Sequence, residues 1–276
     1  MPHYRLYGLI VNSDWSLPEC LPATADTLPD IRIINGQVPE QGIDAHSDDP
    51  YEQSVPGEFW LNVEQVARYW IKNGNEIIIE PYPEADEESI RVYLLGSALG
   101  ALLFQRGLLL IHGNAIEVDG GCLVCVGDSG AGKSTLAAAF LQQGHRLLAD
   151  DVVPVDVNGL ATPGFPRIKL WGDAARQLGI ETTGLRRIMP DMDKYNVPLG
   201  ARFCDSPLPV RWVYVLQAWD QDGFSLEPFE GMARFEPLHE NTYRVHFLEA
   251  MALKPQHLQQ VSKLAGNIRM AKIQRP

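Results

Sequence analysis

The hydrophobic pattern divides the chain into a first part of short β-like runs and a second part in which strands alternate with helices. Three runs in the first part have β character and are bounded by Asn, Gly, Pro or Asp: "LYGLIV" at 6–11, "IRII" at 31–34 and "EIIIEPY" at 76–82. Residues 18–58 are rich in Pro, Asp and Glu and show little periodicity. The pattern predicts a small, mostly β N-terminal module over residues 1–85.

A long apolar helix is predicted to follow this module. The stretch "ADEESIRVYLLGSALGALLFQRG" begins with acidic residues and ends on Arg106-Gly107, which are typical helix start and stop signals. Its longest apolar run, Val92–Phe104, has 13 residues, fewer than the ~20 that a membrane-spanning helix needs. We therefore expect a buried helix that joins the module to a second domain over residues 86–276, and no membrane segment.

The second domain opens with strands that lead into a glycine-rich loop. "LLLIH" (108–112) predicts a buried strand, and "NAIEV" and "CLVCV" predict two more strands joined by the turn Asp119-Gly120-Gly121. "KSTLAAAFLQQ" (133–143) predicts a helix that ends before Gly144, and "HRLLADD" (145–151) predicts another strand. Strand, loop, helix and strand in about thirty residues predict a βαβ unit with two parallel strands, and hence an α/β fold.

The pattern is less regular towards the C-terminus. "VYVLQAW" (213–219) predicts a strand, "RVHFLEAMAL" (244–253) and "PQHLQQVSKLAG" (255–266) predict helices, and "NIRMAKIQ" (267–274) predicts a closing strand.

Composition and charge narrow the class of protein. The 276 residues carry a formal net charge of -12, which argues against general nucleic-acid binding because that depends on Lys and Arg. No apolar core with a cleavage site follows the N-terminal residues, so we expect a cytoplasmic protein.

Cys122 and Cys125 have the C-x-x-C spacing, but no second pair follows. We therefore favour two small core residues over a metal or redox site.

The loop itself predicts a phosphate site. Gly127–Ser134 satisfies the P-loop (Walker A) pattern G-x-x-x-x-G-K-[ST] between a predicted strand and a predicted helix. Glycines allow successive backbone N–H groups to face an anion, Lys133 adds a charge for the phosphates, and the Ser134 hydroxyl can ligate Mg²⁺. The expected nucleotide-binding residues are Gly127, Asp128, Ser129, Gly130, Ala131, Gly132, Lys133, Ser134 and Thr135.

Two adjacent carboxylates supply the candidate chemistry. Asp150 and Asp151 end the predicted strand that follows the helix, so they should lie on the same edge of the sheet as the loop. One can hold Mg²⁺ with Ser134 while the other accepts the proton of an attacking hydroxyl. The alternative is a solvated pair that only ends the strand. His112 ends an earlier strand and can reach the same site. Candidate phosphate or substrate contacts are Arg146, Arg167, Lys169, Arg187 and Lys194.

These motifs together resemble a known family. His112-Gly113, "GDSGAGKS" (127–134) and "GHRLLADD" (144–151) closely resemble the catalytic core of HPr kinase/phosphorylase, which is similar in fold to phosphoenolpyruvate carboxykinase. The resemblance implies a P-loop kinase core, ATP and Mg²⁺ as cofactors, Asp150 as catalytic base, Asp151 near the metal with Ser134, and an assisting His112. It also allows a homo-oligomer. The segments expected of ABC ATPases (L-S-G-G-Q) and GTPases (N-K-x-D) are absent from the sequence.

The chain departs from the bacterial regulators outside this core. Thr135 stands where they usually carry Glu, and "PRIKLWGDA" and "YGLIVNSD" look more like shorter HPr-kinase-like proteins found beside lasso-peptide genes. This resemblance implies an ATP- and Mg²⁺-dependent kinase that phosphorylates a hydroxyl, typically serine, of a peptide or protein acceptor such as a lasso-peptide precursor. The alternatives are a nucleotide-sensing regulatory protein without catalysis and a small-molecule kinase.

Overall fold

The computed structural model describes residues 1–24, 27–189, 192–220 and 222–275. The chain forms two compact units, one made of residues 1–108 and 246–255 and the other of residues 109–245 and 256–276. Each unit combines helices with a β-sheet. The fold is therefore mixed α/β, as the sequence predicts.

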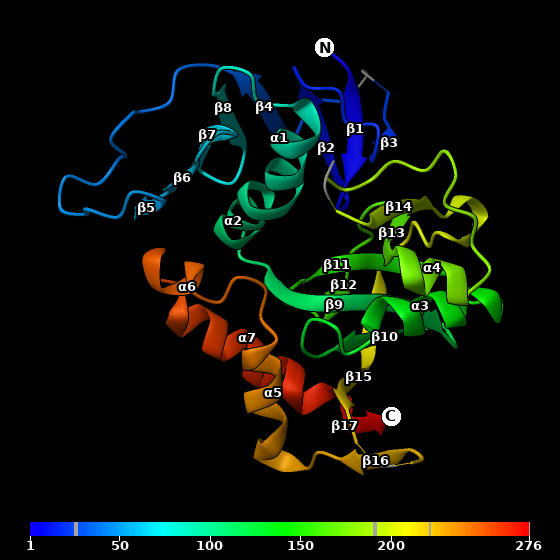
Figure 1. Ribbon diagram of the computed structural model, residues 1–276. Helices are drawn as coiled ribbons and strands as arrows, with labels where there is room; N and C mark the ends of the chain where they lie inside the picture. The colour runs from blue at the N-terminus through cyan, green and yellow to red at the C-terminus, as the bar shows by residue number, and fades with distance from the viewer. Residues whose placement is uncertain (25–26, 190–191, 221, 276) are drawn as a thin grey trace. The chain divides into compact units, whose positions relative to one another are not determined.

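A single mixed sheet organises the first unit. Within the described residues its eight strands follow the order β3-β1-β2-β4-β8-β7-β6-β5 (Figure 1). Most neighbours are antiparallel, but β4 pairs in parallel with both β2 and β8. The strands are β1 (His3–Leu6), β2 (Leu9–Ser13), β3 (Leu21–Pro22), β4 (Ile31–Asn35), β5 (Glu52–Val55), β6 (Glu58–Val63), β7 (Ala67–Lys72) and β8 (Glu76–Pro81).

Two of the predicted strands in this unit are confirmed, and one is corrected. β4 and β8 match the runs at 31–34 and 76–82. The run at 6–11 is not one strand, because Tyr7 and Gly8 have positive φ values of 50° and 74° and turn β1 back onto β2. β5, β6 and β7 were not predicted from the sequence. On β7, buried Ala67, Tyr69 and Ile71 alternate with less buried residues, which is the expected pattern of a strand with one covered face.

The predicted long helix is confirmed, with an irregular centre. It consists of α1 (Glu87–Tyr93), a π-helical turn η1 (Leu94–Ala98) and α2 (Leu99–Gln105) (Figure 1). Asp86 caps its N-terminus by accepting a hydrogen bond of 2.7 Å from the Ser89 N–H. The Tyr69 hydroxyl donates to the Ile90 carbonyl over 2.9 Å, which ties the helix to β7.

A late segment of the chain returns to the first unit. The short helix α6 (Phe247–Ala250) places the Phe247 ring 4.5 Å from the Phe59 ring of β6. The helix predicted over 244–253 is therefore wrong in extent. Arg244 and Ala252 adopt positive φ values of 43° and 55°, which a right-handed helix cannot contain.

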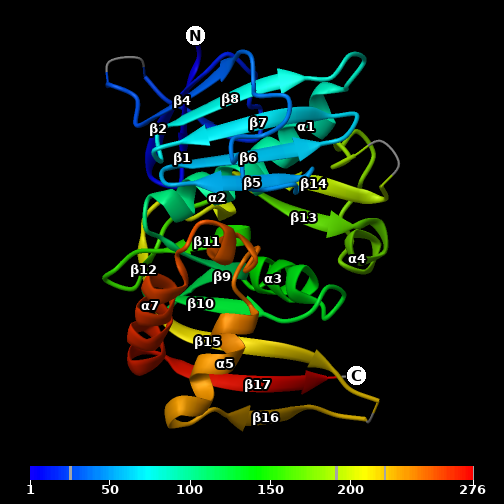
Figure 2. The ribbon, with the colours of Figure 1, turned by 90° about the vertical axis from the view of Figure 1, so that its left-hand side faces the viewer.

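The second unit is built on a sheet of order β10-β9-β11-β12-β15-β17-β16 (Figure 2). β10 also pairs with β15, so the pairings from β10 through β9, β11, β12 and β15 close on themselves. β13 and β14 form a separate hairpin. The strands are β9 (Leu109–Val118), β10 (Gly121–Val126), β11 (Leu147–Val155), β12 (Leu160–Ala161), β13 (Arg167–Trp171), β14 (Lys194–Pro198), β15 (Leu208–Ala218), β16 (Ser225–Pro228) and β17 (Arg269–Arg275).

The start of this unit differs from the sequence prediction in one respect. The runs at 108–112 and 114–118 are not two strands but one, β9, which lies between β10 and β11 and is antiparallel to both. Gly113 allows the strand to continue, because a Cβ at this position would collide with the Cys125 carbonyl oxygen of β10. β10 and β11 are parallel to each other, as predicted, but they are separated by β9.

Helices cover this sheet and connect its strands. The helical segments of the unit are α3 (Lys133–Gln142), α4 (Gly172–Gln177), η2 (Gly200–Arg202), η3 (Gly231–Arg234), α5 (Phe235–Glu240) and α7 (Lys254–Asn267). α7, β15 and β17 confirm the helix predicted at 255–266 and the strands predicted at 213–219 and 267–274. Cys122 and Cys125 are buried and free, and burial raises both thiol pKa values, that of Cys125 to about 12.

Within the described ranges, no helix is both long enough and apolar enough to cross a bilayer.

The buried histidine of α7 predicts an acid-sensitive fold. His257 is 3% exposed, and its Nε2 lies 2.8 Å from the Thr242 hydroxyl. Burial, and secondly the neighbouring His239, lower the pKa of His257 from 6.5 to about 4. Between these values the unfolded chain binds the proton that the folded protein excludes. The free energy of unfolding should therefore fall as pH drops from 6.5 to 4, by up to roughly 3 kcal/mol from this group.

Urea denaturation of the wild type and of His257→Gln at about pH 7 and about pH 4.5 measures this contribution. The variant keeps a polar group beside Thr242 but has no titratable ring, so it should lose less stability between the two pH values. Equal losses in the two proteins would contradict the assignment.

Candidate active site

Three glycines in left-handed conformations shape the loop between β10 and α3. Gly127, Gly130 and Gly132 have φ values of 135°, 87° and 85°. Space around two of them is also closed: a Cβ on Gly127 would meet the Leu216 carbonyl oxygen, and one on Gly132 would overlap the Arg275 guanidinium. The loop therefore requires glycine at position 127 for both conformational and steric reasons, and favours it at 130 and 132 because of their left-handed conformations.

Hydrogen bonds with an adjacent lysine and with residues far away in the sequence hold this loop. Lys133 Nζ donates to the carbonyl oxygens of Gly127 and Asp128 over 2.7 and 3.0 Å. The Gly127 N–H donates to Asn241 Oδ1 over 2.9 Å, and Arg275 donates to the Ala131 carbonyl over 2.8 Å. The Asn241 carbonyl also accepts a 2.7 Å hydrogen bond from the His112 N–H, so one residue contacts both the loop and β9.

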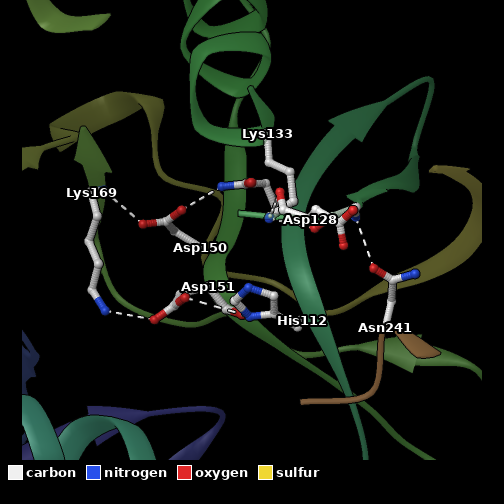
Figure 3. A network of polar contacts seen from close by, with 9 residues as sticks. His112, Asp128, Lys133, Asp150, Asp151, Lys169 and Asn241 are labelled. Atoms are coloured by element: carbon white, nitrogen blue, oxygen red, sulfur yellow. Dashed lines mark hydrogen bonds and ion pairs between the residues drawn. The ribbon is translucent and has the colours of Figure 1, made fainter. Parts of the chain in front are cut away.

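The two aspartates lie side by side on β11 but have different surroundings (Figure 3). Asp150 is 6% exposed, and its carboxylate accepts hydrogen bonds from the Asn114 side chain and from the Lys169 N–H at 2.7 Å. The Asp151 side chain is 31% exposed and accepts a 2.7 Å hydrogen bond from Lys169 Nζ. His112 Nδ1 lies 3.0 Å from the Asp151 carbonyl oxygen and 3.7 Å from its Oδ1.

The register of β9 explains why the loop and the aspartates are close. On β9, Gly113 pairs with Val126 on one side, directly before the loop, and with Asp151 on the other. Strands are about 4.8 Å apart, so the start of the loop and the Asp151 backbone are separated by roughly 10 Å. Asn114 pairs in the same way with Cys125 and Asp150.

Electrostatics drive the pKa values of the two carboxyl groups in opposite directions. Burial, and secondly the charge of Asp151, raise the pKa of Asp150. Burial also acts to raise the pKa of Asp151, but the ammonium group of Lys169, by its charge and its hydrogen bond, outweighs that effect and leaves the pKa well below its usual value. Burial lowers the pKa of His112 against the attraction of Asp151, which favours a neutral imidazole near pH 7.

A cavity of about 410 Å³ brings these groups together within the second unit. Its size lies in the range of small-molecule sites. Ser134 and Asp151 contribute a hydroxyl and a carboxylate to its wall, and such hard oxygen donors fit Mg²⁺. The lining residues are His112, Asn114, Ser129, Gly130, Gly132, Lys133, Ser134, Thr135, Asp150, Asp151, Lys169, Trp171, Asp173, Ala174, Gln177 and Lys194.

No closed metal cage is present among the residues that the structure describes. They contain no group of three or more His, Cys, Asp and Glu side chains that could hold an ion. Mg²⁺ commonly binds through only one or two carboxylates together with substrate phosphates. The donor set of this cavity is therefore compatible with an ion that binds together with a phosphorylated substrate.

Not all of the residues predicted for the site lie at this cavity. Lys169 and Lys194 line it, whereas Arg146 forms a 2.6 Å ion pair with Glu117 near the other end of β9. Arg167 is 9% exposed and lies over the Phe165 ring at 4.8 Å, outside the lining. Arg187 lies over the Tyr195 ring at 5.8 Å.

The structure also adds residues that the sequence analysis missed. Asn114 follows His112 by two positions, so in an extended strand both face the same side, and this spacing could have identified it. Trp171, Asp173 and Gln177 come from the end of β13 and from α4. Asn241 lies more than a hundred positions from Gly127, and no local sequence signal connects them.

Comparisons with known proteins find relatives of part of the chain. Residues 108–162 match the family model described as the HPr serine kinase C-terminal domain. The residues at 108–162 are HPr kinase-like. Their motifs predicted this family, and the prediction is confirmed.

Curated relatives called HPr kinase/phosphorylase match the chain over part of its length. The protein of Caldanaerobacter subterraneus is 45% identical over 118 residues, which cover 42% of this chain and 35% of the relative. That of Pediococcus pentosaceus is 32% identical over 141 residues (50% and 38%), and that of Clostridium beijerinckii is 29% identical over 138 residues (44% and 46%). The chain therefore spans less than half the length of each of these relatives.

A solved structure, the Hpr(Ser) kinase/phosphatase from Coxiella burnetii, also matches. It is 14% identical, with a TM-score of 0.25, and the match covers 60% of this chain and 78% of that one.

The Asn241 contact generates a prediction about the loop. In Asn241→Ala the Gly127 N–H loses its acceptor, so hydrogen exchange at the Gly127 amide should become about tenfold faster. Asn241→Asp retains an oxygen acceptor and should stay close to the wild type. The His112 amide is an internal control, because its partner is the backbone carbonyl of residue 241. Exchange measured by NMR that is equally slow at Gly127 in Asn241→Ala would show that this bond does not hold the loop.

Proposed function

We propose that this protein is a kinase that transfers the γ-phosphoryl group of ATP to a serine-type hydroxyl of a peptide or protein. The observation that carries the proposal is the pair Asp150 and Asp151, which line the same cavity as the glycine loop and have pKa values displaced in opposite directions. Two neighbouring carboxyl groups with divergent pKa values suit two different roles, one as a base and one as a permanently ionised ligand.

The phosphate loop has the features required to bind the nucleotide. Its glycines allow backbone N–H groups to face the phosphates, and α3 begins at Lys133, so its positive end faces the same cavity. Lys133 contributes a full charge. Ser134 and Asp151 would hold Mg²⁺, which when bound supplies positive charge to the β- and γ-phosphates.

Asp150 is the proposed general base. Its raised pKa brings it closer to the pH at which a base is most effective, and each carboxylate oxygen keeps a lone pair beyond the hydrogen bond it accepts. The acceptor oxygen forms a bond to the γ-phosphorus, its proton passes to Asp150, and the bond from that phosphorus to the bridging oxygen of ADP breaks. His112 is proposed to orient Asp151 through the contact of its Nδ1 with the Asp151 backbone.

The proposed acceptor is a serine of a peptide or protein. Relatives of this chain are called HPr kinase/phosphorylase, which supports a protein serine as acceptor. The departures from the bacterial regulators, including Thr135, favour a peptide acceptor such as a lasso-peptide precursor over HPr. We propose that the second unit carries out this chemistry as a P-loop kinase core.

Substitution of the proposed base tests the mechanism. In Asp150→Asn, transfer of labelled phosphate from ATP to the acceptor should fall at least about hundredfold, because the amide cannot accept the proton. ATP binding measured by calorimetry should stay within about a factor of two. Lys133→Ala should instead weaken binding and transfer together.

The matched control for this test is Asp205→Asn, which changes an exposed carboxylate outside the cavity. Transfer at a normal rate in Asp150→Asn would exclude the proposed base. Wild-type protein that binds ATP but phosphorylates neither HPr nor serine peptides would contradict the kinase proposal and favour the nucleotide-sensing alternative.

A pH profile provides an independent test of the same residue. A general base must be deprotonated, so kcat should fall on the acidic side as Asp150 becomes protonated. Because its pKa is raised, this fall should begin above the pH range of an ordinary aspartate. A profile of kcat against pH in the wild type measures the position of that limb. A limb in the range of an ordinary aspartate would contradict the role of Asp150.

A further inference from the structure

Lys169 contacts both aspartates at once. Its backbone N–H donates to Asp150 Oδ2 and its Nζ donates to Asp151 Oδ2, each over 2.7 Å (Figure 3). The Lys169 and Asp151 side chains are 18% and 31% exposed, so the ion pair is partly removed from water. β13, which carries Lys169, forms the cavity wall together with β14, whose first residue is Lys194.

The ion pair between Lys169 and Asp151 opposes the binding of a second cation to the same carboxylate. An ammonium group 2.7 Å from Oδ2 occupies one oxygen of the carboxylate, and His112 Nδ1 lies 3.7 Å from the other. A divalent cation bound to this carboxylate would lie within a few ångströms of the ammonium charge. Charges of the same sign at that separation repel strongly in a site partly removed from water.

Lys194 offers a comparison, because it lines the same cavity without this contact. Its amino group lies over the Trp171 ring, 5.4 Å from the ring centre. A difference between the two lysines would therefore report the direct ion pair rather than the general positive charge of the wall.

We propose that Lys169 is the internal counter-ion of Asp151 and that Lys169 and a divalent cation exclude each other at this carboxylate. Binding of the cation releases the Lys169 ammonium group into the cavity that the phosphate loop lines. The proposal rests on the function proposed above, since it assigns Asp151 to metal binding. Lys169 then acts as a positioning residue that holds the Asp151 carboxylate in place through this hydrogen bond until the cation arrives.

Titration of the full chain with Mn²⁺ alone, followed by the electron paramagnetic resonance signal of the free ion, tests the exclusion. Lys169→Met should bind Mn²⁺ about tenfold more tightly than the wild type, because the cation no longer displaces a charged hydrogen-bonded partner. Lys169→Arg retains the charge and should resemble the wild type. Lys194→Met should gain less than about threefold, since it breaks no ion pair.

A double variant connects the gain to the carboxylate. Asp151→Asn combined with Lys169→Met should lose the tighter binding, because the variant lacks the negative charge of the Asp151 carboxylate to which the cation binds. Mn²⁺ binding by Lys169→Met that is unchanged or weaker than in the wild type would overturn the proposal. A gain that survives in the double variant would overturn it as well.

The wild type allows the same test without any substitution. Mass spectrometry after brief acetylation reports how accessible each lysine amine is, and Mn²⁺ should increase modification of Lys169. Lys263, which donates to the Val157 carbonyl outside this cavity, is the internal control and should not change. Equal modification of Lys169 with and without Mn²⁺ would contradict the release. Neither readout involves phosphoryl transfer, so failure of the kinase proposal would be recognised separately.

Discussion

The pairing of β9 with β10 on one side and β11 on the other is the constraint on which the candidate site depends. Gly113 lies opposite both Val126 and Asp151, so the register fixes how far the phosphate loop can be from the aspartates. A slip of one residue would turn each side chain to the other face of the sheet. Because a Cβ at residue 113 would collide with the Cys125 carbonyl oxygen, the glycine also permits the close pairing of β9 and β10.

Within this framework the protein must place one buried and one partly exposed carboxylate next to each other. Like charges at neighbouring positions oppose ionisation, and burial adds a desolvation penalty for each. The structure resolves this by giving the groups different partners. Asp150 receives neutral donors from Asn114 and the Lys169 backbone, whereas Asp151 receives the Lys169 ammonium group. One carboxyl group can therefore approach neutrality while the other stays ionised.

Much of this site could be predicted because its chemistry lies within a short stretch of sequence. The loop motif, the helix after it and the aspartate pair fall between His112 and Asp151, and local patterns identify them. Their partners could not be found in this way. Asn241 and Arg275 reach the loop through tertiary structure alone, and periodicity does not show which side chain Lys169 will contact.

The differences between the predicted and the observed fold also have identifiable causes in particular residues. β9 was divided in two because Gly113-Asn114 looks like a break, although a central strand tolerates glycine where another backbone approaches closely. β5 to β7 were not predicted, in part because Pro- and acid-rich residues precede them. Trp60 and Trp70 also interrupt the alternation of apolar and polar residues along β6 and β7. The return of residues 246–255 to the first unit depends on contacts such as that of Phe247 with Phe59, which no sequence window contains.

The backbone of Asp151 shows that this site is maintained against a conformational cost. Its φ of 76° is left-handed, a conformation that costs a residue other than glycine about 1–2 kcal/mol. Glycine would remove the strain but also the carboxylate. The hydrogen bond from Lys169 and the contact of His112 with the Asp151 carbonyl both depend on this local geometry. The side chain and the backbone of this strained residue both contact other residues of the cavity, so the surrounding structure, rather than local preference, determines where its carboxylate points.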